Sequence, residues 1–212
     1  MDLMQNHFLR FLYIVPGLIL GFTIHEFCHA ITAYKLGDDM PKAQGRLSLS
    51  PFVHIDLWGF LMVLLVGFGW AKPVQINPRN FKKPKRDDIL VSVAGPLSNL
   101  LLGFLLLVVC HFVTANSGNE PSDFLKTIYI ITYMAATMNI FLFVFNLMPI
   151  PPLDGWHIFK NFLPLRYYKQ INLVEKYSRY ILILFLVSGL SYIIEPIGSV
   201  IINLFENLLR LF

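Results

Sequence analysis

Long apolar runs separated by short polar loops extend along most of this chain. A helix needs about 20 mostly apolar residues to cross a bilayer. The runs that reach this length are 8–34, 88–114, 123–148 and 179–212. Because proline disfavours a continuous helix, we expect Glu195-Pro196 to divide the last run into two hydrophobic helices. The pattern predicts an all-α polytopic membrane protein with about five or six transmembrane helices in total.

A further apolar segment, 57–70, is shorter and has polar sequence on both sides. Its length suits a re-entrant or interfacial element at least as well as a full span. The sequence that follows, GFGWAKPVQINP, is typical of extended or turning chain because it is rich in Gly and Pro. We therefore expect a short re-entrant or interfacial element between the runs 8–34 and 88–114. A full span over 57–70 is the competing interpretation.

The composition supports the membrane class. Hydrophobic residues make up 56% of the 212 residues and charged residues only 14%, whereas about a quarter of the residues of a soluble domain are charged. No removable signal peptide, tandem repeat or low-complexity tract is evident. We expect one membrane-embedded domain over 1–212, with a catalytic core at about 8–157 and C-terminal helices at about 178–212. Cys28 and Cys110 form no metal-type pair and are expected to be buried free thiols.

The net charge of +4 comes mainly from two loops, 72–88 and 155–179. The loop 115–122 contains Glu120 and has neither Lys nor Arg. Loops rich in Lys and Arg remain in the cytoplasm, so the first two loops are predicted to be cytoplasmic and the third to be outside. This bias explains the basic charge without nucleic-acid binding, and no nucleic-acid partner is expected.

The most informative polar residues lie inside the first apolar run, in the sequence TIHEFCHA. His25 and His29 are four residues apart, so on a helix they share one face and can both ligate one zinc ion. Glu26 between them can act as a general base. The alternative is a helix with incidental polar residues. It is disfavoured because ionisable groups in a bilayer are costly and mark functional sites.

A catalytic zinc site has three protein ligands and one open position. Asp154, at the end of NLMPIPPLDG, is the predicted third ligand, because the prolines before it favour irregular backbone that must be buried or line a watery cavity. An ordinary interfacial aspartate is the alternative. A third motif, AGPLSN, contains small residues that allow close helix approach. Within it, Asn99 is a candidate donor to a substrate carbonyl oxygen; a helix-packing asparagine is equally consistent with the sequence.

Taken together, HEFCHA, AGPLSN and NLMPIPPLDG resemble the three signature elements of the site-2 protease family, zinc-dependent intramembrane metalloproteases of peptidase family M50. The segments GRLSLSPFVHIDLWG and GWAKPVQINP are similar to the small bacterial branch without PDZ or CBS domains. The resemblance covers about 20–157. It implies one zinc ion per chain held by His25, His29 and Asp154, with Glu26 as the catalytic base. It also implies a three-helix catalytic core, with additional transmembrane helices and a short re-entrant or β-hairpin-like element between the first two core helices. Cys28 and Trp156 stand where the family often has smaller residues.

The resemblance also implies an orientation. The three motifs must meet at one depth, which places the active site toward the cytoplasmic side of a membrane, expected to be the bacterial inner membrane. The N-terminus is then outside and 57–70 is re-entrant; a full span there would place the N-terminus inside.

The expected activity is regulated intramembrane proteolysis: hydrolysis of peptide bonds within or near a transmembrane segment of a substrate protein. Because a substrate helix hides its peptide bonds in internal hydrogen bonds, it must unwind first, and the chain around 67–78 is a candidate to pair with it as an added strand. The alternatives are a membrane metal-ion transporter and an inactive, helix-binding pseudo-protease. A regulatory partner protein is possible, and the sequence does not identify one.

Four other polar residues have less specific expectations. His54 and His157 are expected to support the site or to lie at the membrane interface rather than to bind zinc. Asn139 and Asn146 are expected to hydrogen-bond between helices.

Overall fold

The computed structural model describes residues 7–66, 69–116 and 121–211. Glu120, in the loop expected outside the membrane, is beyond these residues. The elements in chain order are α1 (His7–Lys35), α2 (Met40–Ala43), α3 (Pro51–His54), α4 (Leu57–Val66), η1 (Pro78–Asn80), α5 (Pro84–Ala115), α6 (Asp123–Asn146), α7 (Asp154–Phe162), η2 (Leu165–Tyr167), α8 (Tyr168–Lys176), α9 (Ser178–Val187), η3 (Leu190–Ile193) and α10 (Ile194–Leu209). No strand occurs within the described ranges, so the predicted all-α class is confirmed.

Three helices are long and apolar enough to cross a membrane: Leu12–Lys35 within α1, then α5 and α6. They correspond to the first three apolar runs of the sequence. Helix α5 begins one turn before the expected 88, because Pro84 occupies a first-turn position where its missing N–H costs nothing. The larger total of about five or six spans is not established by the described residues and stays a prediction.

The buried face of helix α5 carries several polar and small side chains, and its exposed face is apolar. Its exposed residues include Leu97, Leu101, Leu105 and Phe112. Its buried residues include Gly95, Asn99, Gly103 and Cys110. A soluble helix has the opposite pattern, with its apolar face turned to the core. The exposed apolar stripe is therefore the face that contacts lipid, and the chain is a membrane protein.

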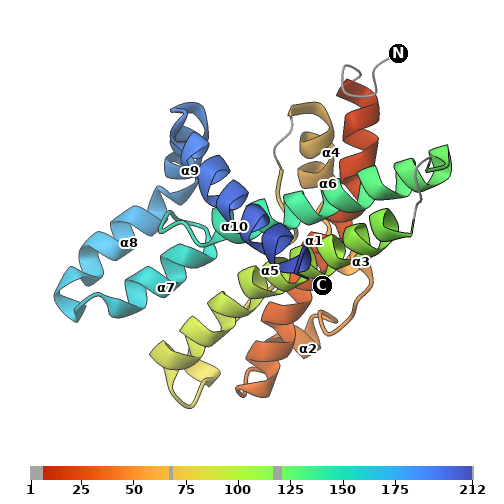
Figure 1. The fold of residues 1–212 in the computed structure, drawn as a ribbon. Helices are drawn as coiled ribbons and strands as arrows, with labels where there is room; N and C mark the ends of the chain where they lie inside the picture. The colour runs from red at the N-terminus through yellow and green to blue at the C-terminus, as the bar shows by residue number, and fades with distance from the viewer. Residues whose placement is uncertain (1–6, 67–68, 117–120, 212) are drawn as a thin grey trace.

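Helices α1, α5 and α6 pack against one another and cross near the centre of the molecule (Figure 1). The packing is close where small residues meet: a Cβ added to Gly17 would lie 2.5 Å from the Cβ of Ala135. Asn139, fully buried on α6, donates hydrogen bonds to the carbonyl oxygens of Gly17 (3.1 Å) and Ala135 (2.8 Å). Asn139 therefore forms a hydrogen bond between helices, as expected.

The connection between α1 and α5 turns back on itself. Helix α4 has ten residues, about 15 Å, which is half the thickness of a bilayer core. Beyond it the chain returns, and a Cβ on Gly59 would lie 2.9 Å from the carbonyl carbon of Trp70. The segment that follows is extended, as expected, and forms one antiparallel bridge between Ile55 and Ala71.

The C-terminal part consists of short helices (Figure 1). Helices α7 and α8 are joined by an ion pair between Lys160 and Glu175 (2.8 Å). Two hydrophobic helices follow, α9 and α10, as predicted, but the predicted junction at Glu195-Pro196 is wrong. The break lies earlier, at Gly189, which has a positive φ of 77°. Pro196 is instead accommodated in the first turn of α10.

Candidate metal centre and active site

His25 and His29 lie on the same face of α1, as their spacing predicts, and both are buried. Their Nε2 atoms are 2.9 Å apart. The Nδ1 atoms point away from each other, toward α5: His25 Nδ1 is 2.6 Å from Oδ1 of Asn99, and His29 Nδ1 is 2.8 Å from the carbonyl oxygen of Val91. Both partner atoms are acceptors, so each Nδ1 carries a hydrogen. In the neutral rings both Nε2 atoms therefore present lone pairs to the same point.

Asp154, the first residue of α7, completes the cluster. Its Oδ2 lies 3.1 Å from Nε2 of His25 and 3.3 Å from Nε2 of His29. Among the described residues no hydrogen-bond donor reaches Oδ2. The carboxylate oxygen is thus directed at the two imidazole lone pairs.

The three ligand atoms fit a zinc ion. Two nitrogens and one oxygen that present lone pairs to one point are suited to a cation at their centre. Two ligands of a tetrahedral zinc ion at about 2.1 Å are about 3.4 Å from each other, and the three separations here range from 2.9 to 3.3 Å. In the part of the chain that the structure describes, no other group of three His, Cys, Asp or Glu side chains is placed to hold a metal.

Gly95 is required by the cluster itself. A Cβ at this position would overlap the imidazole of His29 at Nε2 and would lie 2.8 Å from Cε1 of His25. The sequence interpretation of AGPLSN was close helix approach. The structure gives a more specific reason: α5 carries glycine where the two rings need the space in front of their ligand atoms.

Asn99 contacts His25 at Nδ1, the ring nitrogen that points away from the other ligand atoms. It is fully buried, and its Nδ2 donates to the carbonyl oxygen of Gly21 (3.2 Å) and to Oδ1 of Asn139 (2.9 Å). Both amide hydrogens are used, and Oδ1 accepts from His25. This differs from the arrangement expected from the sequence, in which the amide donates to a substrate oxygen, because no amide hydrogen remains for that purpose.

Glu26 lies on α1 between the two histidines and is buried. Its Oε2 accepts a hydrogen bond from the backbone N–H of Val74 at 3.0 Å. The extended segment after α4 therefore lies directly against the predicted base. Nothing in the sequence motif indicated this contact, since Val74 takes part through its backbone.

Other side chains hold the Val74 segment in place. Arg46 donates to the carbonyl oxygens of Val53, Lys72 (3.0 Å) and Pro73 (3.5 Å). Gln44 accepts from the N–H of Gln75 (3.4 Å) and donates to its carbonyl oxygen (3.3 Å). The sequence offered no signal for these two residues, because a side chain that bonds to distant backbone leaves no periodic pattern.

The remaining polar residues lie outside the ligand set. His54 is fully buried and bonds to the carbonyl oxygen of Ser48 at 2.7 Å. Burial, and then the charge of Lys160, lower the pKa of His157, which keeps this imidazole neutral. Asn146 donates within its own helix to the carbonyl oxygen of Leu142 at 2.9 Å, so the expected bond to another helix is not the one formed. Both cysteines are free thiols, as expected, but only Cys110 is buried, whereas Cys28 is half-buried.

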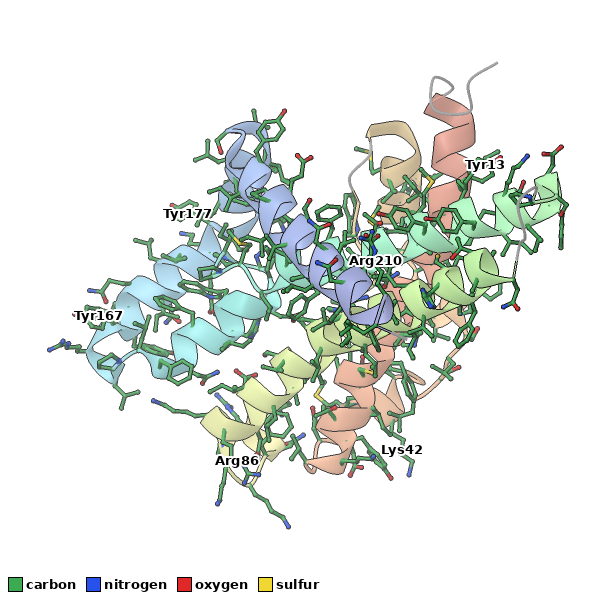
Figure 2. The ribbon with its side chains drawn as sticks, viewed as in Figure 1. Tyr13, Lys42, Arg86, Tyr167, Tyr177 and Arg210 are labelled. Atoms are coloured by element: carbon green, nitrogen blue, oxygen red, sulfur yellow. The ribbon has the colours of Figure 1, made fainter. Side chains whose placement is uncertain are left out.

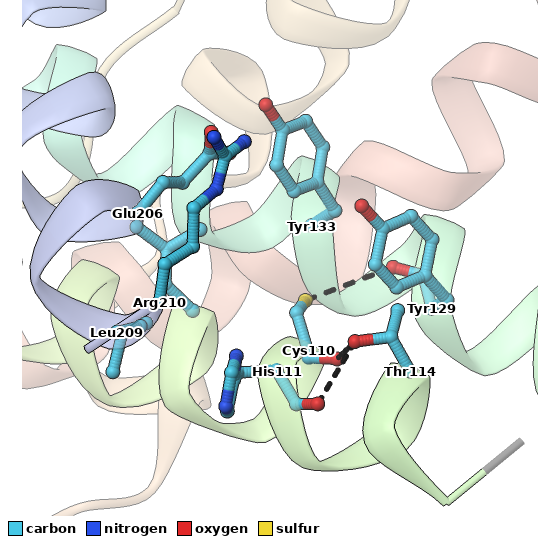
Figure 3. Close-up of a pocket in the computed structure, with 9 residues that line it drawn as sticks. Cys110, His111, Thr114, Tyr129, Tyr133, Glu206, Leu209 and Arg210 are labelled. Atoms are coloured by element: carbon cyan, nitrogen blue, oxygen red, sulfur yellow. Dashed lines mark hydrogen bonds between the residues drawn. The ribbon is translucent and has the colours of Figure 1, made fainter. Parts of the chain in front are cut away.

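A second cavity lies at the opposite end of α5 (Figure 3). Cys110 and His111 contribute to it from α5, whereas the metal ligands face Gly95 on the same helix. These positions are about 22 Å apart along the helix axis, so the cavity is separate from the metal centre.

Comparison with known proteins agrees with this site. The sequence model of peptidase family M50 matches residues 122–189. The chain is 42% identical over 188 residues to "Putative zinc metalloprotease YwhC" of Bacillus subtilis, covering 87% of this chain and 84% of that protein. It is 31% identical over 151 residues to "Putative zinc metalloprotease Rip2" of Mycolicibacterium smegmatis, covering 69% of this chain and 55% of that protein.

A more distant relative is "Zinc metalloprotease MJ0392" of Methanocaldococcus jannaschii, 24% identical over 175 residues, which are 82% of this chain and 41% of that protein. No solved structure matches the chain. The extent and identity of the Bacillus match, together with the family match over the segment that contains Asp154, show that the chain belongs to peptidase family M50, the site-2 protease family of zinc metalloproteases.

Proposed function

We propose that this protein is a zinc-dependent endopeptidase that hydrolyses peptide bonds within or next to transmembrane segments of other membrane proteins. One observation carries the proposal. His25, His29 and Asp154 converge on one point beside Glu26, and the two histidines lie in a helix long and apolar enough to span a membrane. A metalloprotease site built at that depth acts on substrates that reach it through the membrane.

A zinc ion held by His25, His29 and Asp154 would supply polarisation of the scissile carbonyl and a lower pKa for the attacking water. Glu26 takes a proton from that water and delivers it to the leaving nitrogen. The N–H of Val74 occupies Oε2 of Glu26, which fixes the carboxylate and leaves Oε1 for the proton. Because Glu26 is buried, these transfers take place away from bulk solvent.

We assign Asn99 a positioning role. Its Oδ1 accepts the Nδ1 hydrogen of His25, which fixes the tautomer that presents Nε2 to the metal. Asn139 in turn holds the Asn99 amide at 2.9 Å, so residues from all three core helices orient one ligand. The carbonyl oxygen of Val91 does the same for His29.

The orientation in the membrane follows from charge. Lys42, after α1, and Arg86, at the start of α5, lie at the same end of the molecule (Figure 2). Basic residues gather on the cytoplasmic side, so we place this end, and the metal centre near it, toward the cytoplasm of a bacterial inner membrane. The return of the chain at Gly59 and Trp70 supports a re-entrant α4 and an N-terminus outside.

We place the unwound substrate beside the extended segment that contains Val74. This segment already pairs through Ala71 with Ile55, and it contacts the proposed base. A substrate strand added there would bring its peptide bonds close to Glu26.

The experiment that tests the function replaces Glu26 with Gln in the full-length protein and follows cleavage of a model transmembrane peptide. Retained zinc with lost cleavage supports the protease. Zinc transport into proteoliposomes that persists in this variant would favour a transporter, and cleavage that is unaffected would exclude the mechanism.

A further inference from the structure

Two charged residues lie at the C-terminal end of α10. Ile194, Gly198 and Ile202 are the buried residues of this helix. Glu206, near the end of the helix, is half-buried, and Arg210, which caps the helix, is exposed. Both line a cavity to which α5 and α6 also contribute.

These side chains line a cavity of about 200 Å³ between α5, α6 and α10 (Figure 3). The other polar groups around it are Cys110, His111, Tyr129 and Tyr133. The two tyrosine rings are stacked, with centroids 5.8 Å apart and planes inclined by 15°. The cavity is thus lined by a carboxylate, a guanidinium and two phenol groups. These groups can hydrogen-bond to a polar ligand, whereas apolar lipid tails could make no use of them.

Glu206 and Arg210 do not neutralise each other. The ion pairs found among the described residues involve neither of them, although they are separated by one helical turn. The Tyr133 hydroxyl hydrogen-bonds to Glu206. A carboxylate and a guanidinium that line one cavity without pairing with each other are complementary to a ligand that carries both signs. The carboxylate and the tyrosine faces suit an ammonium group, and the guanidinium suits a phosphate.

The cavity lies at the depth of the membrane surface. Thr114, which also lines it, is in the last turn of α5, and Tyr129 is within two turns of the start of α6. Both helices meet the aqueous boundary at these ends, opposite the metal centre. We propose that this cavity binds the headgroup of a phosphoethanolamine lipid, with the ammonium at Glu206 and the phosphate at Arg210. This inference does not depend on the proposed protease activity.

The proposed site should discriminate between lipids by their headgroups. Phosphatidylethanolamine offers N–H donors to the Glu206 carboxylate. Phosphatidylcholine has a quaternary ammonium without N–H donors, and phosphatidylglycerol has no cation. Selectivity among these three lipids therefore reports on Glu206, whereas retention of the phosphate reports on Arg210.

The test uses the full-length protein in detergent and counts bound dioleoyl phosphatidylethanolamine, phosphatidylcholine and phosphatidylglycerol by native mass spectrometry. We expect one phosphatidylethanolamine per chain, bound about tenfold more weakly in Glu206→Gln and in Arg210→Gln, the equivalent of one charged hydrogen bond. Glu195→Gln, an exposed acid on the same helix, and Arg166→Gln, an exposed base near α8, are matched controls and should bind as the wild type does.

Equal binding of all three lipids by the wild type would overturn the proposal without any variant. Unchanged binding in both Glu206→Gln and Arg210→Gln would overturn it too. Water-soluble O-phosphoethanolamine is the remaining probe: if it binds as tightly as the lipid, the ligand is a soluble zwitterion and the lipid assignment is wrong. Much weaker binding of this probe supports the membrane source.

Discussion

Oδ1 of Asn99 lies 2.6 Å from Nδ1 of His25, and the amide of Asn99 is held in turn by Asn139. The contact joins two helices at the metal ligand, and every polar atom of the Asn99 side chain takes part in it or in its support. A polar residue inside a membrane helix thus orients one imidazole ring.

Replacing Asn99 with Ala should weaken zinc binding by about 10- to 100-fold, because His25 loses the acceptor that fixes its tautomer. Competition with a coloured chelator measures the affinity, and thermal unfolding of the metal-free protein measures the fold. Asn99→Asp keeps an acceptor and should recover most of the affinity. Equal losses in the Ala and Asp variants would contradict a positioning role.

Gly95→Ala should lower the bound zinc well below one ion per chain, because its methyl group occupies the space of the His29 and His25 rings. Metal analysis of the purified protein checks the result. Gly103→Ala is the matched control on the same helix, since its Cβ would meet only Ile140 Cγ1 at 2.7 Å and the carbonyl oxygen of Ala136 at 3.1 Å. That variant should lose about 1–3 kcal/mol of stability through overpacking but keep its zinc.

Removing zinc with a chelator should lower the melting temperature of the wild type. A ligand that binds only the folded state adds about 2.7 kcal/mol when its concentration is 100 times Kd. Asp154→Ala has lost one of three ligands and should melt at the same temperature with and without chelator. A chelator-sensitive Asp154→Ala protein would show that Asp154 is not required for metal binding.

Val74→Pro should reduce kcat by about tenfold or more while zinc content stays constant, because the variant removes the N–H bonded to the Glu26 carboxylate. Gln75→Pro is the control on the same segment, since it removes an N–H that bonds only to Gln44. Steady-state cleavage of a transmembrane peptide compares the two. Similar losses in both variants would indicate a general distortion of the segment.

The pairing of α7 with α8 should depend on pH. Burial by itself would raise the pKa of Glu175, but Lys160, at 2.8 Å, lowers it below its ordinary value of 4.5. Because the folded-state pKa is the lower one, the ion pair contributes its full stability above the unfolded-state pKa and loses it as the pH falls through the folded-state value. The pair is partly exposed, so the contribution is below about 1 kcal/mol.

Thermal unfolding of the wild type and of Glu175→Gln should therefore differ at neutral pH and converge below about pH 4. Glu195→Gln, which removes an exposed carboxylate, should match the wild type throughout this range. A difference that grows on acidification would mean that Glu175 is protonated in the folded protein.

The long elements and the ligands were predictable because each leaves a local signal. Hydropathy marks the three spans, and the spacing of His25 and His29 places both rings on one face. Asp154 is recognisable as the acid that follows a run of prolines at the end of a span. The break at Gly189 was missed because Pro196 is the stronger signal in sequence, although a helix tolerates proline in its first turn.

The supporting contacts were not predictable from one sequence. Asn139 was expected to bond between helices, but its link to His25 through Asn99 depends on how three helices are rotated. Val74 acts through its backbone, so no side-chain pattern marks it. The cavity contacts of Glu206 and Arg210 become visible only once the packing of α10 beside α5 and α6 is known. In each case the missing information is the pairing of distant segments.

Asp154 is separated from His25 and His29 along the sequence by the whole of α5 and α6, so the ribosome makes the three side chains at different times. During synthesis His25 and His29 emerge first, and the third ligand follows only after α5 and α6 have been made. A nascent chain that has inserted α1 alone cannot hold the metal in the geometry that hydrolysis requires. The order of the three side chains along the polypeptide therefore means that the proposed metal site is complete only when α7, which begins with Asp154, has joined the core helices.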